Sequence, residues 1–486
     1  MIFNSFTYLI FLLLFTTLFW ILNNKFRMYL IFISSLIFYS FWRFDFLLLL
    51  IITILINFIC AIKIENNLEN KYKKKYFFFA LFCNIFLIIF FKYTYFLVDT
   101  VNFFVPINNI FIISFNIILP LGISFYTFQS ISYIIDIYNK RCEAEKNFIN
   151  FANYLIFFPQ LIAGPIVRSS ELIWQLKENK KLNLLILNIG VKKIFIGLFI
   201  KLFLADNIAF FLDEAFNQDY KYYSNLDTLT LAYAYGFQIY FDFAGYSLIA
   251  IGSANLVGIQ LPENFNFPYL SKNPKEFWTR WHISLSSWIR DYLYLPLIKQ
   301  KTLNFSTGGF VDLNSKQKIS SGFSLLVTWM VMGLWHGANW SFVIWGLYHA
   351  LLILIWRFFD KFYKSLNNNL LLLIIYLSNL TLIMLSWIPF KTQNLEKTFS
   401  MWSNLFSIEK WFYLSLKENT YLYTFLIFIG VFFSRFIYNE ILLISIKINS
   451  IKNFLTKCFQ LTIWVLIVII VLGHMKQTNL FIYFQF

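Results

Sequence analysis

Charged residues are scarce in this chain: they make up 13% of its 486 amino acids, whereas hydrophobic residues make up 59%. A soluble domain carries about twice that share of charge, so the composition argues against an ordinary soluble protein. Cysteine is also rare. Its four residues lie far apart without a Cys-x-x-Cys pair, and therefore neither a disulfide framework nor a zinc site is predicted.

Several catalytic motifs are missing as well. The sequence contains no Gly-x-Ser-x-Gly elbow, no P-loop, no His-Glu-x-x-His pair and no dinucleotide-binding Gly-x-Gly-x-x-Gly. Their absence argues against a serine hydrolase, an ATPase, a zinc protease and a nicotinamide enzyme. We therefore expect no bound cofactor and no metal.

What the chain has instead is a series of long apolar runs. They approach or reach the ~20 residues that a helix needs to cross a bilayer. They are apolar on all sides, which favours helices over strands. The clearest are residues 2–22, 46–62, 77–98, 370–389 and 461–473. We predict an all-α, polytopic integral membrane protein.

No linker rich in proline, glycine or serine divides the sequence, and no repeat period is visible. We therefore predict a single membrane domain over residues 1–486. Between residues 155 and 352 the apolar runs are interrupted by glycine, proline and charge. Irregular backbone at membrane depth occurs where it is buried in protein or lines a watery cavity, so this middle part is expected to hold the functional site.

The net charge of +16 comes largely from lysine and arginine in short loops between the runs, for example in residues 63–75. Lys25 and Arg27 likewise follow the first run, which has no basic residue before it. This placement agrees with the positive-inside rule and puts the start of the first run outside. Anionic lipids, rather than nucleic acid, are the expected partner of the charge.

Residues 276–298 form a different kind of segment, EFWTRWHISLSSWIRDYLYLPLI. Aromatic and apolar side chains recur at helical spacing on one side, from Phe277 to Tyr292, whereas polar ones gather on another. We predict one amphipathic helix at the cytoplasmic face of the membrane. A surface helix without chemistry explains the same pattern.

The motif VMGLWHGANW places His336 in one of the most apolar parts of the chain. An ionisable side chain inside a span is costly and is a candidate for function, and a neutral imidazole can move protons near pH 7. Gly333 and Gly337 lack side chains one turn apart, which allows another helix or a ligand to come close. The motif also offers groups that would wall a pocket or orient a substrate carbonyl: Trp335, Trp340 and Asn339. A buried histidine that only joins two helices by a hydrogen bond is the alternative.

The other three histidines are weaker candidates. His282 lies in the amphipathic segment and can meet His336 only if that segment lines the same cavity. His349 would point away from His336 on a continuous helix, which favours a structural role. His474 ends the last apolar run and is expected at the membrane interface.

Five motifs, taken in their order along the chain, resemble one family. They are NPKEFWTRWHISLSSWIRDYLYLPL (273–297), MGLWHGANWSFVIWGLYHA (332–350), FFPQLIAGPIVRSSELIWQL (157–176), QIYFDFAGYSLIAIG (238–252) and the terminal FIYFQF (481–486). Together they are similar to the membrane-bound O-acyltransferase (MBOAT) family. Within it they resemble the bacterial branch of the alginate and peptidoglycan O-acetylation proteins. The resemblance covers residues 119–486, whereas residues 1–118 match only in hydropathy.

The resemblance implies a ring of tilted helices around a funnel and a tunnel, with acyl-CoA, such as acetyl-CoA, entering from the cytoplasm as donor. The near-invariant histidine of the family corresponds to His336, and its second functional position, an Asn, Asp or His, corresponds to His282. His336 would act as a general base on the attacking hydroxyl; an acyl-imidazole intermediate is the competing mechanism. Arg280 and Arg290 would hold the phosphates of CoA. Asn339 would steady the carbonyl oxygen as charge develops on it.

Within this branch, the acetyl group crosses the bacterial cytoplasmic (inner) membrane and passes to a separate extracytoplasmic, hydrolase-like transferase. The sequence contains no globular domain of that kind, so the resemblance implies a partner protein. The final acceptor, peptidoglycan or alginate, stays open.

Two other classes of protein fit the composition. A transporter or flippase of a cell-envelope precursor would also be polytopic and would use intramembrane carboxylates such as Asp136 and Asp242. It is expected to carry an internal repeat, and none is visible. A structural scaffold would tolerate replacement of His336.

Overall fold

The computed structural model describes residues 1–67, 69–105, 116–218, 220–298, 315–408, 411, 413–442, 451–475 and 481–482. Within these ranges the regular structure is helical and no strand occurs. Five helical segments of the described residues are long and apolar enough to cross a membrane: Phe46–Asn66, Lys71–Phe104, Leu184–Phe216, Trp340–Lys364 and Asn369–Thr392. The predicted all-α, polytopic class is therefore confirmed.

The chain separates into two compact units, each assembled from segments that are distant in the sequence. The first comprises Met1–Leu202, Phe243–Glu263 and Trp464–Gln485. The second comprises Phe203–Asp242 and Asn264–Ile463. Neither unit ends near residue 118, where the resemblance begins. The single membrane domain over residues 1–486 stays a prediction.

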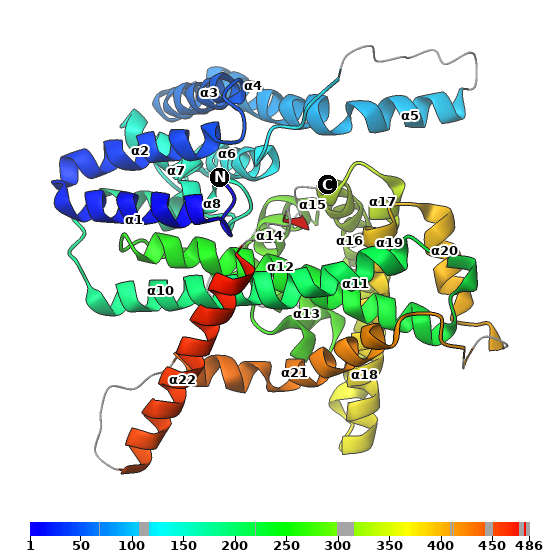
Figure 1. Ribbon diagram of the computed structural model, residues 1–486. Helices are drawn as coiled ribbons and strands as arrows, with labels where there is room; N and C mark the ends of the chain where they lie inside the picture. Colours follow the sequence, from blue (N-terminus) through cyan, green and yellow to red (C-terminus); the bar gives the residue numbers. More distant parts are fainter. Residues whose placement is uncertain are drawn as a thin grey trace. The chain divides into compact units, whose positions relative to one another are not determined.

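The first unit contains the N-terminal helices, coloured blue to cyan-green in Figure 1. They are α1 (Phe6–Ile21), α2 (Asn24–Ser40), α3 (Phe46–Asn66), α4 (Asn70–Ile88), α5 (Thr94–Phe104), α6 (Ile123–Tyr138), α7 (Phe148–Ile156), α8 (Phe158–Leu161), α9 (Ser169–Lys177) and α10 (Leu184–Phe199). A π-helical turn over Ile89–Tyr93 joins α4 to α5, and another, Ile200–Ala205, follows α10.

Helices α3 and α4 lie side by side and are joined by a polar pair within their apolar contact (Figure 1). The Asn57 amide donates to Asn84 Oδ1 at 3.2 Å, and the Asn84 amide donates to Asn57 Oδ1 at 2.8 Å. Both side chains are buried. An amide inside a membrane protein is stable when its groups are hydrogen-bonded across helices, so this pair fixes how the two helices meet.

Two pairs of glycines bring α10 into backbone contact with the part of α12 (Asn225–Asn255) that belongs to the same unit. A Cβ on Gly190 would lie 2.9 Å from the carbonyl oxygen of Gly252, and one on Gly197 would lie 2.6 Å from that of Gly245. On each helix the two glycines are about two turns apart. Small residues spaced in this way let antiparallel helices approach closely in a membrane.

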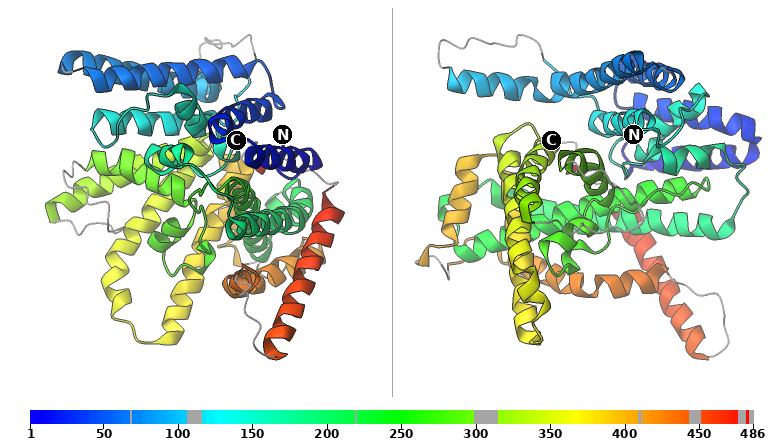
Figure 2. Two further views of the ribbon diagram at one scale, coloured as in Figure 1. Left: turned by 90° about the vertical axis from the view of Figure 1, so that its left-hand side faces the viewer. Right: turned by 180° about the vertical axis from the view of Figure 1, so that it is seen from behind.

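The second unit contains most of the C-terminal half of the chain. Its elements are α11 (Asp206–Phe216), α13 (Pro274–Arg280), α14 (Ile283–Ile289), α15 (Leu295–Leu297), α16 (Ser315–His336), α17 (Trp340–Lys364), α18 (Asn369–Ser386), α19 (Ile388–Thr392), α20 (Leu395–Asn404) and α21 (Glu418–Leu442). Short 3-10 turns span Tyr220–Tyr222 and Pro268–Leu270, and a π-helical turn spans Arg290–Tyr294. The last helix, α22 (Ile451–His474), belongs to both units. Figure 2 shows α17 and α18 as two long yellow helices joined at one end by residues 365–368.

The continuous amphipathic helix predicted for residues 276–298 is wrong. The segment is broken after Arg280 and continues as α14 from Ile283, followed by the π-helical turn and α15. Several residues on both sides of the break are buried, among them Phe277, Leu285 and Trp288. The aromatic pattern read as a membrane-surface face therefore packs inside the second unit.

Candidate active site

His336 is the last residue of α16, and α17 begins a few residues later, so the histidine lies at the bend of a tight helical hairpin. The two helices touch through glycine. A Cβ on Gly333 would lie 2.1 Å from the carbonyl oxygen of Phe342, and one on Gly346 would lie 2.1 Å from that of Trp329. The sequence predicted that Gly333 admits a close neighbour, and the neighbour is helix α17.

We predict that Gly346→Ala strongly destabilises the second unit. The added methyl would meet a backbone carbonyl, which cannot turn aside as a flexible side chain can. Overpacking of this kind costs about 1–3 kcal/mol of unfolding free energy. The check is the melting temperature of the purified protein in detergent. Gly430→Ala is the matched control, because nothing lies within 4 Å of its added Cβ; a melting temperature of Gly346→Ala equal to that of this control would contradict the prediction.

Aromatic rings surround the imidazole of His336, which is 3% exposed. The ring centroids of Trp335 and Trp345 each lie 4.9 Å from that of His336, and the centroid of Phe390 lies 5.1 Å away. All three rings stand edge-on or nearly so to the imidazole. A base in such surroundings is screened from bulk water, which is the condition that a reactive acyl donor requires.

His282 lies against the same tryptophan. Its ring centroid is 6.1 Å from that of Trp335, and its side chain is fully buried. Burial lowers the pKa of His282 from 6.5 to about 3, so this imidazole is neutral at physiological pH. The structure therefore brings His336 and His282 to one tryptophan, although they are distant in the sequence.

The break before α14 sets the position of His282. Its φ of 41° and ψ of 56° are left-handed, a conformation that costs most residues about 1–2 kcal/mol. Backbone bonds hold the chain in it: the Ile283 amide donates to the Asn264 carbonyl at 2.9 Å, and the Asn266 amide donates to the Arg280 carbonyl at 3.0 Å. Ser284 Oγ also donates to Asn264 Oδ1 at 2.6 Å. The segment that carries Asn264 thus fixes the imidazole.

Asn339 and Trp340, the last two residues of the WHGANW motif, lie at the start of α17. Asn339 caps α17, because its Oδ1 accepts from the Ser341 amide at 2.8 Å, and its amide donates to the Gln393 carbonyl at 3.0 Å. Trp340 is 46% exposed. Trp335 is buried against His336, whereas Trp340 begins α17 with much of its side chain exposed; that the two tryptophans wall one substrate pocket stays a prediction. One of the two N–H groups of the Asn339 amide is engaged by Gln393, and the expected role of the amide in steadying a substrate carbonyl stays a prediction.

Arg280 and Arg290 each meet a carboxylate of their own segment. Arg280 Nη2 lies 2.6 Å from Glu276 Oε1, and Arg290 Nε lies 2.7 Å from Asp291 Oδ1. Both guanidinium groups are partly exposed. Their predicted role in holding the phosphates of CoA stays a prediction.

His349 is held by packing. Trp278 Nε1 donates to its Nδ1 at 3.3 Å, and its Nε2 lies 3.0 Å from Ser386 Oγ. These contacts agree with the structural role expected from the sequence. The expectation that it faces away from His336 was drawn for a continuous helix and is wrong, because the rings of both histidines lie 4.9 Å from that of Trp345.

Sequence reasoning missed Trp345 and Phe390 as neighbours of His336. Trp345 belongs to α17, beyond the bend, and Phe390 belongs to α19. The one signal for Phe390 was Pro389, which interrupts an apolar run. In the part of the chain that the structure describes, no group of three or more His, Cys, Asp or Glu side chains is placed to hold a metal ion.

Comparison with known proteins identifies the kind of protein to which this site belongs. Residues 143–388 match the family model described as MBOAT, membrane-bound O-acyltransferase family. The probable alginate O-acetylase AlgI of Pseudomonas syringae pv. tomato is 35% identical over 415 residues, which cover 85% of this chain and 76% of that protein. The peptidoglycan O-acetyltransferase of Helicobacter pylori is 35% identical over 390 residues, covering 75% of this chain and 71% of that protein.

A third relative matches over a shorter stretch: the teichoic acid D-alanyltransferase of Bacillus subtilis is 35% identical over 266 residues, which cover 52% of this chain and 64% of that protein. The matched region of the family model contains His282 and His336. The chain belongs to the membrane-bound O-acyltransferase family, and it is an O-acyltransferase. Among the classes considered from the sequence, this favours the enzyme over the transporter and the scaffold.

Proposed function

We propose that the protein transfers acetyl, or another small acyl group, from cytoplasmic acyl-CoA across the bacterial inner membrane for O-acetylation of a cell-envelope polysaccharide. The observation that carries this proposal is the pair of buried histidines that share Trp335 in a chain of the O-acyltransferase family. The alginate and peptidoglycan enzymes among its relatives support acetyl as the group and a polysaccharide as the final acceptor.

His336 acts as the general base in the proposed mechanism. Its imidazole takes the proton of the acceptor hydroxyl while that oxygen attacks the thioester carbonyl carbon. The carbon–sulfur bond then breaks, and the CoA sulfur leaves with the proton that His336 took from the hydroxyl. The rings of Trp335, Trp345 and Phe390 keep water from competing with the hydroxyl. An acyl-imidazole on His336, formed and then broken by the hydroxyl, is the competing mechanism.

His282 supports the reaction from its place beside Trp335. As a neutral imidazole it can donate one hydrogen bond and accept another. We assign it the task of orienting the acceptor hydroxyl or stabilising charge on the carbonyl oxygen. Arg280 and Arg290 contact the phosphates of CoA through guanidinium N–H groups that do not face Glu276 and Asp291. A separate extracytoplasmic, hydrolase-like transferase receives the acetyl group.

The experiment compares a deletion strain with the same strain carrying the wild-type gene. We expect O-acetyl groups to disappear from one purified envelope polymer, peptidoglycan or exopolysaccharide, and to return on complementation. Inverted membrane vesicles then test the donor, because their cytoplasmic face is accessible: radiolabelled acetyl-CoA should label the lumenal acceptor only when this chain is present. Unchanged O-acetylation of both polymers in the deletion strain would refute the proposal.

A further inference from the structure

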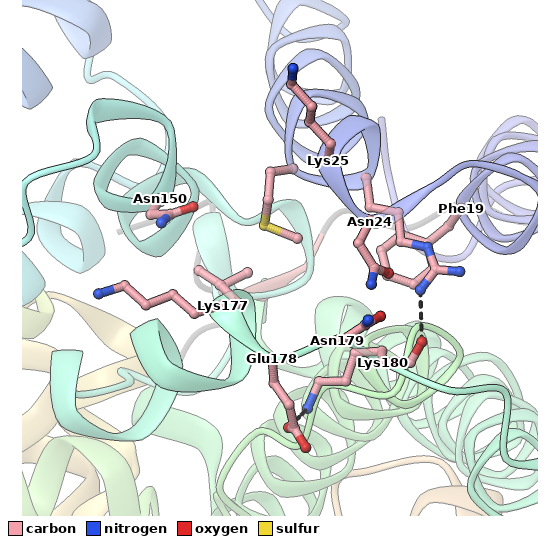
Figure 3. Close-up of a pocket in the computed structure, with 11 residues that line it drawn as sticks. Phe19, Asn24, Lys25, Asn150, Lys177, Glu178, Asn179 and Lys180 are labelled. Atoms are coloured by element: carbon pink, nitrogen blue, oxygen red, sulfur yellow. Dashed lines mark hydrogen bonds and ion pairs between the residues drawn. The ribbon is translucent and has the colours of Figure 1, made fainter.

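The charged cavity of the first unit, about 280 Å³ in volume and drawn in Figure 3, is lined by groups that meet partners within the protein. Lys180 pairs with Glu178, and Lys177 pairs with Glu145, each at 2.5 Å. Arg27 Nη1 donates to the Lys180 carbonyl at 2.8 Å, a bond drawn in the same figure. A buried polar group that has no partner in the protein is a stronger sign of an absent ligand, and the second unit contains one.

That group is the indole N–H of Trp345 in α17. The side chain of Trp345 is fully buried, and its Nε1 has no hydrogen-bond partner among the residues that the structure describes. An indole N–H can only donate a hydrogen bond. Because a buried donor without an acceptor costs free energy, native proteins keep few of them, and each one requires an explanation. An acceptor that arrives with the substrate is such an explanation.

The neighbours of Trp345 account for the missing partner. Both ring nitrogens of His349 are engaged, one by Trp278 and the other by Ser386. The remaining rings around Trp345 offer no ordinary acceptor atom, and their centroids lie between 5.3 and 6.2 Å from its own: Trp278, Trp329, Trp387 and Phe390. The indole N–H is therefore enclosed by groups that cannot accept its hydrogen bond.

The position of Trp345 suits the reaction at His336. Its ring centroid lies 4.9 Å from that of the imidazole, and the two ring planes are nearly perpendicular, at 83°. A general base lies about 3 Å from the hydroxyl oxygen that it deprotonates, and that oxygen approaches the carbonyl carbon to roughly 3–3.5 Å. A ring that adjoins the imidazole is therefore within the range of the carbonyl oxygen.

The backbone of Trp345 is also rigidly held. The next residue, Gly346, makes one of the closest contacts of the hairpin, since a Cβ added to it would lie 2.1 Å from the Trp329 carbonyl oxygen. A donor on a packed helix does not need to reorganise when charge develops in front of it. Such fixed donors stabilise an oxyanion most effectively.

We propose that Trp345 is a catalytic residue whose Nε1–H donates a hydrogen bond to the carbonyl oxygen of the acyl donor; this inference rests on the proposed function. When the hydroxyl oxygen attacks the carbonyl carbon, its proton passes to His336 and the electron pair of the C=O bond moves onto the carbonyl oxygen. The indole stabilises that oxyanion without transferring its proton. The C=O bond forms again as the carbon–sulfur bond breaks and the CoA sulfur takes the proton from His336.

The test replaces the indole of Trp345 by the isosteric benzothiophene ring, through stop-codon suppression with 3-benzothienylalanine. This side chain keeps both fused rings and has sulfur in place of the N–H. The kcat of acetyl transfer in inverted membrane vesicles should fall at least about 100-fold, the effect of one lost oxyanion donor, whereas the KM for acetyl-CoA should stay near the wild-type value. The melting temperature in detergent should not fall, because no hydrogen bond within the protein is lost.

The same replacement at Trp402 is the matched control, because its Nε1 donates to the Leu385 carbonyl at 3.2 Å. It should lower the melting temperature and leave kcat unchanged. An unchanged kcat for the replacement at Trp345, with His336→Ala inactive in the same vesicles, would overturn the proposal and leave the proposed function standing. A fall in kcat that is matched by a fall in melting temperature would also overturn it, since it would assign the indole to packing.

Discussion

Replacement of His336 by alanine is expected to reduce O-acetylation of the envelope polymer at least about 100-fold, to the level of the deletion strain, because general-base catalysis contributes 10²–10⁴-fold. The imidazole is almost completely buried among Trp335, Trp345 and Phe390. The ring of His349 also lies 4.9 Å from that of Trp345, but its two nitrogens are engaged by Trp278 and Ser386. His336→Gln should behave like His336→Ala, because an amide does not take a proton near neutral pH.

O-acetyl content is measured in the deletion strain that carries each variant, and the membrane level of the protein is measured in parallel. His474→Gln serves as the control, since this histidine ends α22, where its Nδ1 lies 2.8 Å from the Ile470 carbonyl oxygen of the same helix. It should acetylate like the wild type. Normal acetylation by His336→Ala at an equal protein level would remove the catalytic assignment.

Variants of His282 are expected to separate the effect of backbone strain on stability from the effect of the imidazole on activity. The left-handed conformation at this position suits glycine and, to a lesser degree, asparagine. His282→Gly should fold at the wild-type level, since glycine adopts this conformation freely, and still lose about 100-fold in acetyl transfer. His282→Asn should retain more activity than His282→Gly, because its amide fits the backbone and can still donate and accept a hydrogen bond.

The measurement is the rate of acetyl transfer by membranes that contain equal amounts of each variant. A third variant, His282→Ala, completes the set: it lacks the imidazole and is also strained by about 1–2 kcal/mol, so it should melt below His282→Gly. Full activity of His282→Gly would assign His282 to packing. The ordering of the three variants therefore tests the conformation and the chemistry separately.

The sequence predicted the membrane class well, because the composition of a span is a local property. The run at 46–62 became α3, and the run at 370–389 became α18 and α19. Gly333 likewise admits a close neighbour, as its lack of a side chain predicted. These predictions need only the identity of neighbouring residues.

The site could not be predicted to the same depth, because its geometry depends on contacts between distant segments. The pattern of residues 276–298 is continuous, yet Asn264 and Asn266 bond across the break and turn the chain at His282. Nothing in the sequence around Asn339 distinguishes a helix cap from a residue that binds substrate. The position of His349 was judged on a helix that in fact ends at His336. In each case a tertiary contact overrode the local pattern.

The glycine pairs between α10 and α12 have a consequence for biosynthesis. Roughly 50 residues separate Gly197 from Gly245, so at ~5–20 residues per second α10 enters the bilayer several seconds before its partner is made. During that interval the glycine face of α10 lacks the matching face of α12, against which its backbone packs. The two helices therefore join only when the matching glycines of α12 arrive. The order of translation therefore contributes to the alignment of α10 with α12.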